Sequence, residues 1–172
     1  MKIGILSDTH KKTKLAQKAI AHLVKNGAEF LIHSGDIGEP ETLELLKNSG
    51  LKYVAVYGNN DAHLASYHNQ YNLVQEPYYF KLANTKFKLM HLPFYMNPDA
   101  DVIIFGHTHI FECDFKNNTL FLNPGEACAR NKAVSECAML EVDKNRYNVT
   151  YYNKKPKEDT FGESHFFFER TL

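Results

Sequence analysis

The 172-residue sequence has few cysteines, no net charge and no long apolar run. Its cysteines, Cys113, Cys128 and Cys137, form no C-x-x-C pair, which argues against a disulfide framework or a structural zinc knuckle and favours reduced thiols. Twenty basic residues balance twenty acidic ones, so no global field would hold nucleic acid or anionic lipid. No apolar stretch approaches the ~18 residues of a membrane span, and the first apolar run ends at Asp8, too early for a signal peptide. We therefore expect a cytoplasmic protein without a membrane partner or strong nucleic-acid binding.

The sequence also lacks an internal repeat, a long linker and the G-x-G-x-x-G turn of a Rossmann nucleotide site. Hydrophobic content of 44% and charged content of 23% are those of an ordinary globular domain. We expect one domain over residues 1–172, in which residues 154–172 dock on the body or on another subunit. The reason is the Phe166-Phe167-Phe168 run, because a free tail rarely carries three phenylalanines. The same run makes a homo-oligomer a prediction to test.

Apolar runs and helical patterns alternate in the first sixty residues. Strands are predicted at residues 2–7, 28–33 and 51–57, and helices at residues 13–26 and from Pro40 to about Gly50. This βαβαβ order favours a parallel sheet with right-handed crossovers. The second half instead predicts short strands at residues 78–82, 85–90, 102–105, 111–115, 120–122, 138–142 and 147–152. Together these patterns predict an α/β (α+β) chain with packed sheets flanked by helices from the first half.

Five short polar motifs follow the apolar runs, and they carry most of the functional information. They are Ser7-Asp8-Thr9-His10, Ser34-Gly35-Asp36, Gly58-Asn59-Asn60-Asp61, Met90-His91 and Gly106-His107-Thr108-His109. Each motif alone fits an ordinary polar turn, but strand ends gathered at one edge of a sheet build a site. Carboxylate, amide and imidazole donors suit borderline first-row divalent metals. The series predicts a two-metal site with seven candidate ligands: Asp8, His10, Asp36, Asn59, His91, His107 and His109.

These motifs resemble those of the calcineurin-like metallophosphoesterase superfamily, whose pattern runs D-x-H, G-D, G-N-H-D/E, H and G-H-x-H. The resemblance covers about residues 1–145. Asn123-Pro124-Gly125 and the G-N-x-D variant are similar to the compact bacterial and archaeal phosphodiesterase branch. The resemblance implies a four-layer β-sandwich flanked by helices. It also implies one metal ion on Asp8, His10, Asp36 and His109, and a second on Asp36, Asn59, His91 and His107, with Asp36 bridging.

The resemblance implies hydrolysis of a small phosphodiester, or a monoester, by direct attack of a hydroxide that bridges two divalent ions. Manganese is the expected metal, with nickel, zinc, iron and magnesium as alternatives. The candidate catalytic residues are Asp36, Asn60 and Asp61, of which Asp61 is expected to orient His10 or another ligand. The candidate substrate-binding residues are Asn60 and Arg130.

Some positions depart from the family pattern. Asn60 stands where the larger family has a histidine, and an amide can donate a hydrogen bond but cannot supply a proton, so substrates with good leaving groups are favoured. His63 is the alternative source of that proton. The second histidine of H-G-H is missing after His91, and the connection to the next motif is short, which predicts an open rim. Glu126 replaces the usual serine after Asn-Pro-Gly.

Two other functions stay open at this point. A non-catalytic metal-binding scaffold that binds a protein partner would resemble the retromer subunit, which keeps this architecture but has lost ligands. The presence of all seven candidate ligands argues against it. A metal-dependent nuclease is the second alternative, and the absence of net charge and of a basic stripe argues against it.

Overall fold

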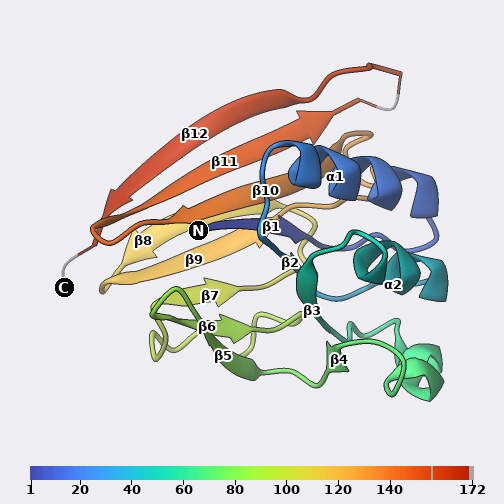
Figure 1. Ribbon diagram of the computed structural model, residues 1–172, viewed down its shortest axis with the longest axis horizontal. Helices are drawn as coiled ribbons and strands as arrows, with labels where there is room; N and C mark the ends of the chain where they lie inside the picture. The colour runs from blue at the N-terminus through green and yellow to red at the C-terminus, as the bar shows by residue number, and fades with distance from the viewer. Residues whose placement is uncertain (156, 171–172) are drawn as a thin grey trace.

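The structure is a computed structural model that describes residues 1–155 and 157–170. Two β-sheets lie face to face, and helices cover one side of the pair (Figure 1). The strand order is β12-β11-β10-β1-β2-β3-β4 in the seven-stranded sheet and β5-β6-β7-β9-β8 in the five-stranded sheet. The expected sandwich of sheets flanked by helices is confirmed. None of the helices in the described ranges has the length and apolar character needed to cross a membrane.

The seven-stranded sheet contains the predicted βαβαβ unit. Strands β1 to β4 pair in parallel, whereas β10 joins β1 antiparallel and brings the second half of the chain into the same sheet. The strands are β1 (Lys2–Leu6), β2 (Phe30–His33), β3 (Lys52–Val56), β4 (Leu73–Val74), β10 (Ser135–Val142), β11 (Arg146–Lys154) and β12 (Gly162–Glu169). Its helices are α1 (Thr13–Lys25), α2 (Pro40–Lys47) and the 3-10 helix η1 (Ala62–Tyr67).

The five-stranded sheet supplies the other wall of the main core. Its strands are β5 (Tyr78–Leu82), β6 (Thr85–Leu89), β7 (Val102–Ile104), β8 (Phe111–Lys116) and β9 (Thr119–Pro124). Aliphatic side chains from both sheets meet between them, because alternate residues of each strand point inward. This buried cluster includes Ile3, Ile5, Ile32, Val54, Val56, Phe87, Leu89, Val102, Ile104, Leu120 and Leu122. A second cluster joins α1 and α2 to the outer face of the seven-stranded sheet.

The outer face of the five-stranded sheet is covered by the β6–β7 connection, so the fourth layer there is irregular chain and not a helix. Met96 packs against the buried cluster on that face. Lys88 holds the connection in place, because its buried ammonium donates to the carbonyls of Tyr95 at 2.7 Å and Asn97 at 3.2 Å and pairs with Asp99 at 2.6 Å. The short segment between two of the candidate ligand motifs is therefore anchored.

The aromatic end of the chain forms an edge strand. β12 pairs antiparallel with β11 from Gly162 to Glu169. Phe166 and Phe168 pack against the core between the sheets, whereas Phe167 is 68% exposed. Two of the three phenylalanines therefore pack within the same chain, and a homo-oligomer stays a prediction. Residues 156, 171 and 172 of the expected extension 154–172 lie outside the described residues.

Candidate metal centre

The seven candidate ligands lie just beyond the carboxyl ends of strands from both sheets. Asp8 and His10 follow β1, Asp36 follows β2 and Asn59 follows β3. The other three follow strands of the five-stranded sheet: His91 follows β6, and His107 and His109 follow β7. Parallel strands end at the same edge, so the folding pattern itself brings these side chains together.

One half of the site joins Asp8, His109, His10 and Asp36 through donor-atom contacts. Asp8 Oδ1 lies 3.2 Å from His109 Nε2. His109 Nε2 lies 3.5 Å from His10 Nε2. The same His10 nitrogen lies 3.7 Å from Asp36 Oδ2. All of these atoms carry lone pairs when the histidines are neutral, so they form a pocket of electron-pair donors.

The other half begins at the second oxygen of Asp36. Asp36 Oδ1 lies 3.5 Å from His91 Nε2, which lies 3.0 Å from Asn59 Oδ1. Asn59 Oδ1 is also 3.1 Å from His107 Nδ1. The seven residues thus form one unbroken series of contacts with Asp36 at its centre. Donor atoms of Asp8, Asp36 and His91 also lie within 4.8 Å of one another, so Asp8 is close to both halves.

The backbone at these positions is left-handed. φ is positive at five of the candidate ligands: Asp8 (52°), His10 (44°), Asp36 (52°), His107 (68°) and His109 (61°). Non-glycine residues seldom adopt this conformation, and when they do they cluster at functional sites. Close packing adds to the constraint, because a Cβ on Gly58 would lie 2.1 Å from the Asp36 nitrogen. The loops hold the side chains in place at a cost in backbone energy.

Asp8 is the clearest sign that a cation belongs here. Its side chain is fully buried, Oδ2 accepts a hydrogen bond from Ser7 at 2.6 Å, and Oδ1 accepts none within the described chain. Burial alone would raise the pKa of Asp8, but its contacts with His109 and Ser7 outweigh burial and lower it, so a buried negative charge remains. Such a charge needs a positive partner.

His109 is held between two carboxylates. Its Nδ1 donates to Glu126 Oε2 at 2.5 Å, while Nε2 faces Asp8. The contact with Asp8 and then the bond to Glu126 raise the pKa of His109 to about 9. Fixing the proton on Nδ1 leaves Nε2 free to bind a metal, which is the usual role of a carboxylate behind a ligand histidine.

Glu126 contacts a candidate ligand, a role that the sequence pattern does not assign. It is fully buried after β9, and its Oε1 accepts from the backbone N–H of Asn131 at 2.6 Å and Lys132 at 2.9 Å. Two backbone donors therefore fix the carboxylate that orients His109. The signal available in the sequence is its departure from the usual serine after Asn-Pro-Gly, which marks the position but not its partner.

Asp61, which is expected to orient His10 or another ligand, binds backbone N–H groups. It is fully buried, and its carboxylate accepts from the backbone N–H of Ile37 at 2.9 Å, Gly38 at 2.9 Å and Gly58 at 2.8 Å. It therefore ties the loop that carries Asp36 to the loop that carries Asn59, and does not orient His10 through its side chain. Asp61 therefore contacts the loops of two candidate ligands through their backbone.

Asn60 contacts Asp36 from the second of these loops. Its backbone N–H donates to Asp36 Oδ1 at 3.0 Å, and its Nδ2 donates to Oδ2 at 2.7 Å. Both oxygens of the central carboxylate are thus oriented by one residue. The amide that was expected to meet substrate is used here to position Asp36.

An open cavity of about 550 Å³ adjoins the ligand cluster. His10, Asn60, His63 and Arg130 are among its lining residues. Arg130 is exposed, and its guanidinium makes no hydrogen bond or ion pair with the described residues. The His63 Nε2 donates to the Gly38 carbonyl at 2.8 Å, and the other ring nitrogen makes no hydrogen bond within residues 1–155 and 157–170. A small anion in this cavity would meet a free positive charge beside the ligands.

Comparison with known proteins identifies the family. A model of the calcineurin-like phosphoesterase superfamily domain matches residues 1–145. A phosphodiesterase from Methanocaldococcus jannaschii is 29% identical over 160 residues, covering 86% of this chain and 96% of that protein. The solved structure of a novel archaeal phosphodiesterase matches with a TM-score of 0.75 at 25% identity, covering 96% of this chain and 100% of the other.

Vps29 from Entamoeba histolytica, solved in complex with Zn²⁺, has the same fold, with a TM-score of 0.76 at 20% identity over 96% of this chain and 98% of the other. This likeness concerns architecture alone. The family model, in contrast, spans all five motifs of the ligand cluster. The chain therefore belongs to the calcineurin-like phosphoesterase superfamily and is a metal-dependent phosphoesterase.

Proposed function

We propose that the protein is a phosphodiesterase that hydrolyses a small phosphoester with two divalent metal ions. Asp8, His10, Asp36 and His109 would hold one ion, and Asp36, Asn59, His91 and His107 the other. The observation that carries the proposal is the unbroken series of contacts through all seven side chains with Asp36 at its centre. A carboxylate in that position can offer one oxygen to each half.

The donor set fits such ions. Oxygen and imidazole ligands suit manganese, the expected metal, and also nickel, zinc, iron and magnesium to differing degrees. The His91 ring supports this, because its Nδ1 donates to the Ser34 carbonyl at 2.9 Å and its Nε2 lone pair then faces the oxygens of Asn59 and Asp36. When bound, two ions supply an activated water near neutral pH and neutralise charge on the phosphoryl group.

The chain's own groups would bind and orient the ester. Arg130, which has no side-chain partner among the described residues and lines the 550 Å³ cavity, would hold a non-bridging phosphoryl oxygen. Asn60 keeps both Asp36 oxygens in place, and a contact of Asn60 with substrate remains part of the proposal. Since Asn60 cannot give a proton, the leaving group must depart unaided or take its proton from His63, so esters of acidic alcohols should react fastest.

Hydrolysis of bis-p-nitrophenyl phosphate tests the proposal. The protein is stripped with a chelator and then reloaded with manganese, nickel, zinc or magnesium, and both bound metal and turnover are measured. We expect about two equivalents of metal and restored turnover. Asp36→Ala should lose both together, whereas Asp114→Ala removes an exposed carboxylate of β8 and should lose neither. Full loading and turnover in Asp36→Ala would overturn the scheme.

The alternative is a non-catalytic scaffold that binds a protein partner. The likeness to Vps29 is the observation in its favour, and it concerns the fold alone. The complete ligand series argues against it, because a scaffold has no need to gather seven donor side chains at one place. Metal binding without turnover of any diester or monoester, for any of the four metals, would support the scaffold.

A further inference from the structure

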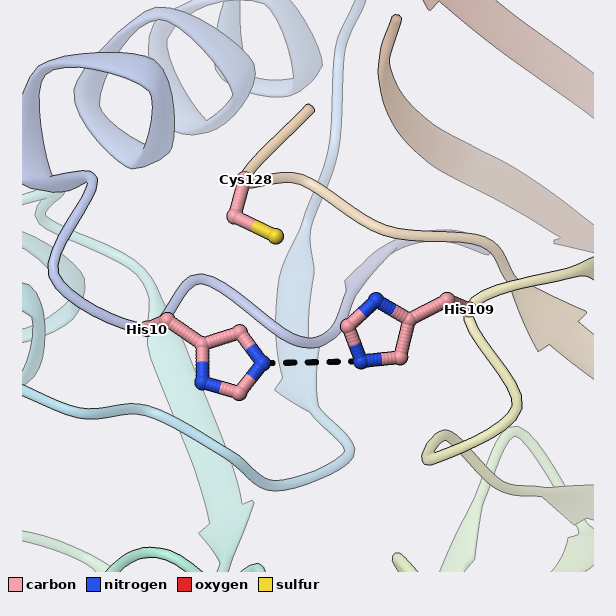
Figure 2. A group of neighbouring side chains, drawn as sticks. All are labelled: His10, His109 and Cys128. Atoms are coloured by element: carbon pink, nitrogen blue, oxygen red, sulfur yellow. Dashed lines mark hydrogen bonds between the residues drawn. The ribbon is translucent and has the colours of Figure 1, made fainter. Parts of the chain in front are cut away.

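A cysteine lies beside the first half of the metal site. Cys128, in the turn after β9, points its sulfur toward the rings of His10 and His109 (Figure 2). Its Sγ and one nitrogen from each histidine lie within 4.8 Å of one another. The thiol is 2% exposed, so the sulfur faces the site and not bulk solvent.

The backbone fixes the position of this sulfur. The N–H groups of Ala127 and Cys128 donate to the carbonyls of Ser7 at 3.0 Å and Asp8 at 3.1 Å, so the turn is bonded to the loop that carries the first ligands. Cys128 Sγ also lies 3.7 Å from Glu126 Oε2, the oxygen that accepts from His109. A turn held by these three contacts keeps the sulfur beside the histidines.

A second observation points to a cation at the same place. Asp8 Oδ1, fully buried and without a hydrogen-bond donor in the described chain, lies 3.2 Å from His109 Nε2. Two imidazoles and a thiol thus lie close together, and the Asp8 carboxylate contacts one of the imidazoles. These residues come from three separate segments of the chain. This donor set is softer than the oxygen-rich half around Asp36 and Asn59, and sulfur ligands favour zinc over manganese.

We propose that Cys128 is a metal ligand that makes the half of the site around His10 and His109 selective for thiophilic ions such as Zn²⁺ and Cd²⁺. Binding breaks the S–H bond, forms a sulfur–metal bond and passes the proton to solvent. The other half keeps its preference for harder ions. This inference rests on the proposed two-metal site, which it refines by assigning a donor that the family pattern does not include.

Cobalt and zinc titrations of the whole protein test the inference. A thiolate bound to Co²⁺ gives a near-ultraviolet charge-transfer band, which should be present in the unsubstituted protein and absent in Cys128→Ser and Cys128→Ala. Cys113→Ser, a half-buried cysteine on β8, is the matched control and should keep the band. Loss of a ligand should weaken zinc binding by at least the ~10- to 100-fold that loss of an outer-shell partner causes, with manganese affinity little changed.

Proton release provides an independent measurement. Zinc uptake by the unsubstituted protein should release one more proton than uptake by Cys128→Ser, measured with a pH indicator in weak buffer. Equal cobalt spectra and equal zinc affinities in the folded unsubstituted and Cys128→Ser proteins would overturn the inference while leaving the two-metal phosphoesterase intact. Failure of all of these proteins to bind any metal would instead overturn the proposed function, and this inference with it.

Discussion

Replacing Glu126 by glutamine should weaken metal binding without unfolding the protein. The carboxylate accepts from His109 on one oxygen and from two backbone N–H groups on the other. A glutamine has the same shape but only one acceptor oxygen. In either orientation, its NH₂ group must face an N–H donor, at His109 or at the backbone. The stable arrangement keeps the backbone bonds and moves the His109 proton to Nε2, the nitrogen that would bind metal.

The size of the effect follows from known outer-shell substitutions. These typically cost 10- to 100-fold in metal affinity, which corresponds to about 1.4 to 2.7 kcal/mol. The folding cost should be smaller, since only one of the buried bonds is exchanged. The pKa of His109 in the metal-free protein, raised to about 9 by Asp8 and then Glu126, should fall toward its ordinary value.

Isothermal titration with Zn²⁺ and Mn²⁺ measures the affinity, and NMR of the metal-free protein follows the His109 ring. The matched control is Glu112→Gln, which removes the same charge from an exposed position close to His109 in sequence. Metal affinity of Glu112→Gln should stay within about twofold of the parent if affinity depends on the Glu126–His109 hydrogen bond and not on a distant negative charge. A folded Glu126→Gln protein that binds both metals as tightly as the parent would refute the reasoning.

Three further outcomes are expected. Asp61→Asn should lower the free energy of unfolding by at least about 2 kcal/mol in urea, because an NH₂ group would face buried N–H donors; a change no larger than that of exposed Asp114→Asn would contradict this. Burial lowers the pKa of His33 to about 4 from an ordinary 6.5. As pH falls, the unfolded chain therefore gains a proton before the folded chain does. The free energy of unfolding of the metal-free protein should fall by up to roughly 3 kcal/mol between pH 6.5 and 4, and His33→Gln should reduce this pH dependence. Because His109 is protonated below about pH 9, apparent metal affinity should rise with pH up to that value, by up to about tenfold per unit; a flat titration between pH 6 and 9 would exclude His109 as a ligand.

Much of this architecture is encoded in local patterns. Apolar runs bounded by glycine, proline and polar turns identify the strands, and the βαβαβ order is sufficient to predict parallel pairing. The candidate ligands are found because they stand at the ends of those runs, where parallel topology brings distant residues together. His10 and His109 are ninety-nine positions apart in the chain, yet their Nε2 atoms are 3.5 Å apart.

Residues that act from irregular turns are harder to find. Glu126 and Cys128 lie beyond a strand end with no periodic pattern around them, and their partners come from other loops. The backbone partners of Asp61 are hidden for a related reason, since a carboxylate that accepts from backbone N–H groups has no partner visible in side-chain identities. β12 is also hidden in the sequence, because six of its eight residues are exposed and only its pairing with β11 shows it to be a strand.

The left-handed backbone at Asp8, His10, Asp36, His107 and His109 restricts how this centre can be altered in the laboratory. Aspartate, asparagine, histidine and glycine tolerate positive φ, whereas valine, isoleucine and threonine do so poorly. In a randomised library at these positions, a functional variant would thus need both a side chain that can bind metal and a residue that tolerates positive φ. Engineers who wish to change the bound ion should therefore exchange ligands within that small alphabet, or recruit new ones from neighbouring turns whose torsion angles are ordinary.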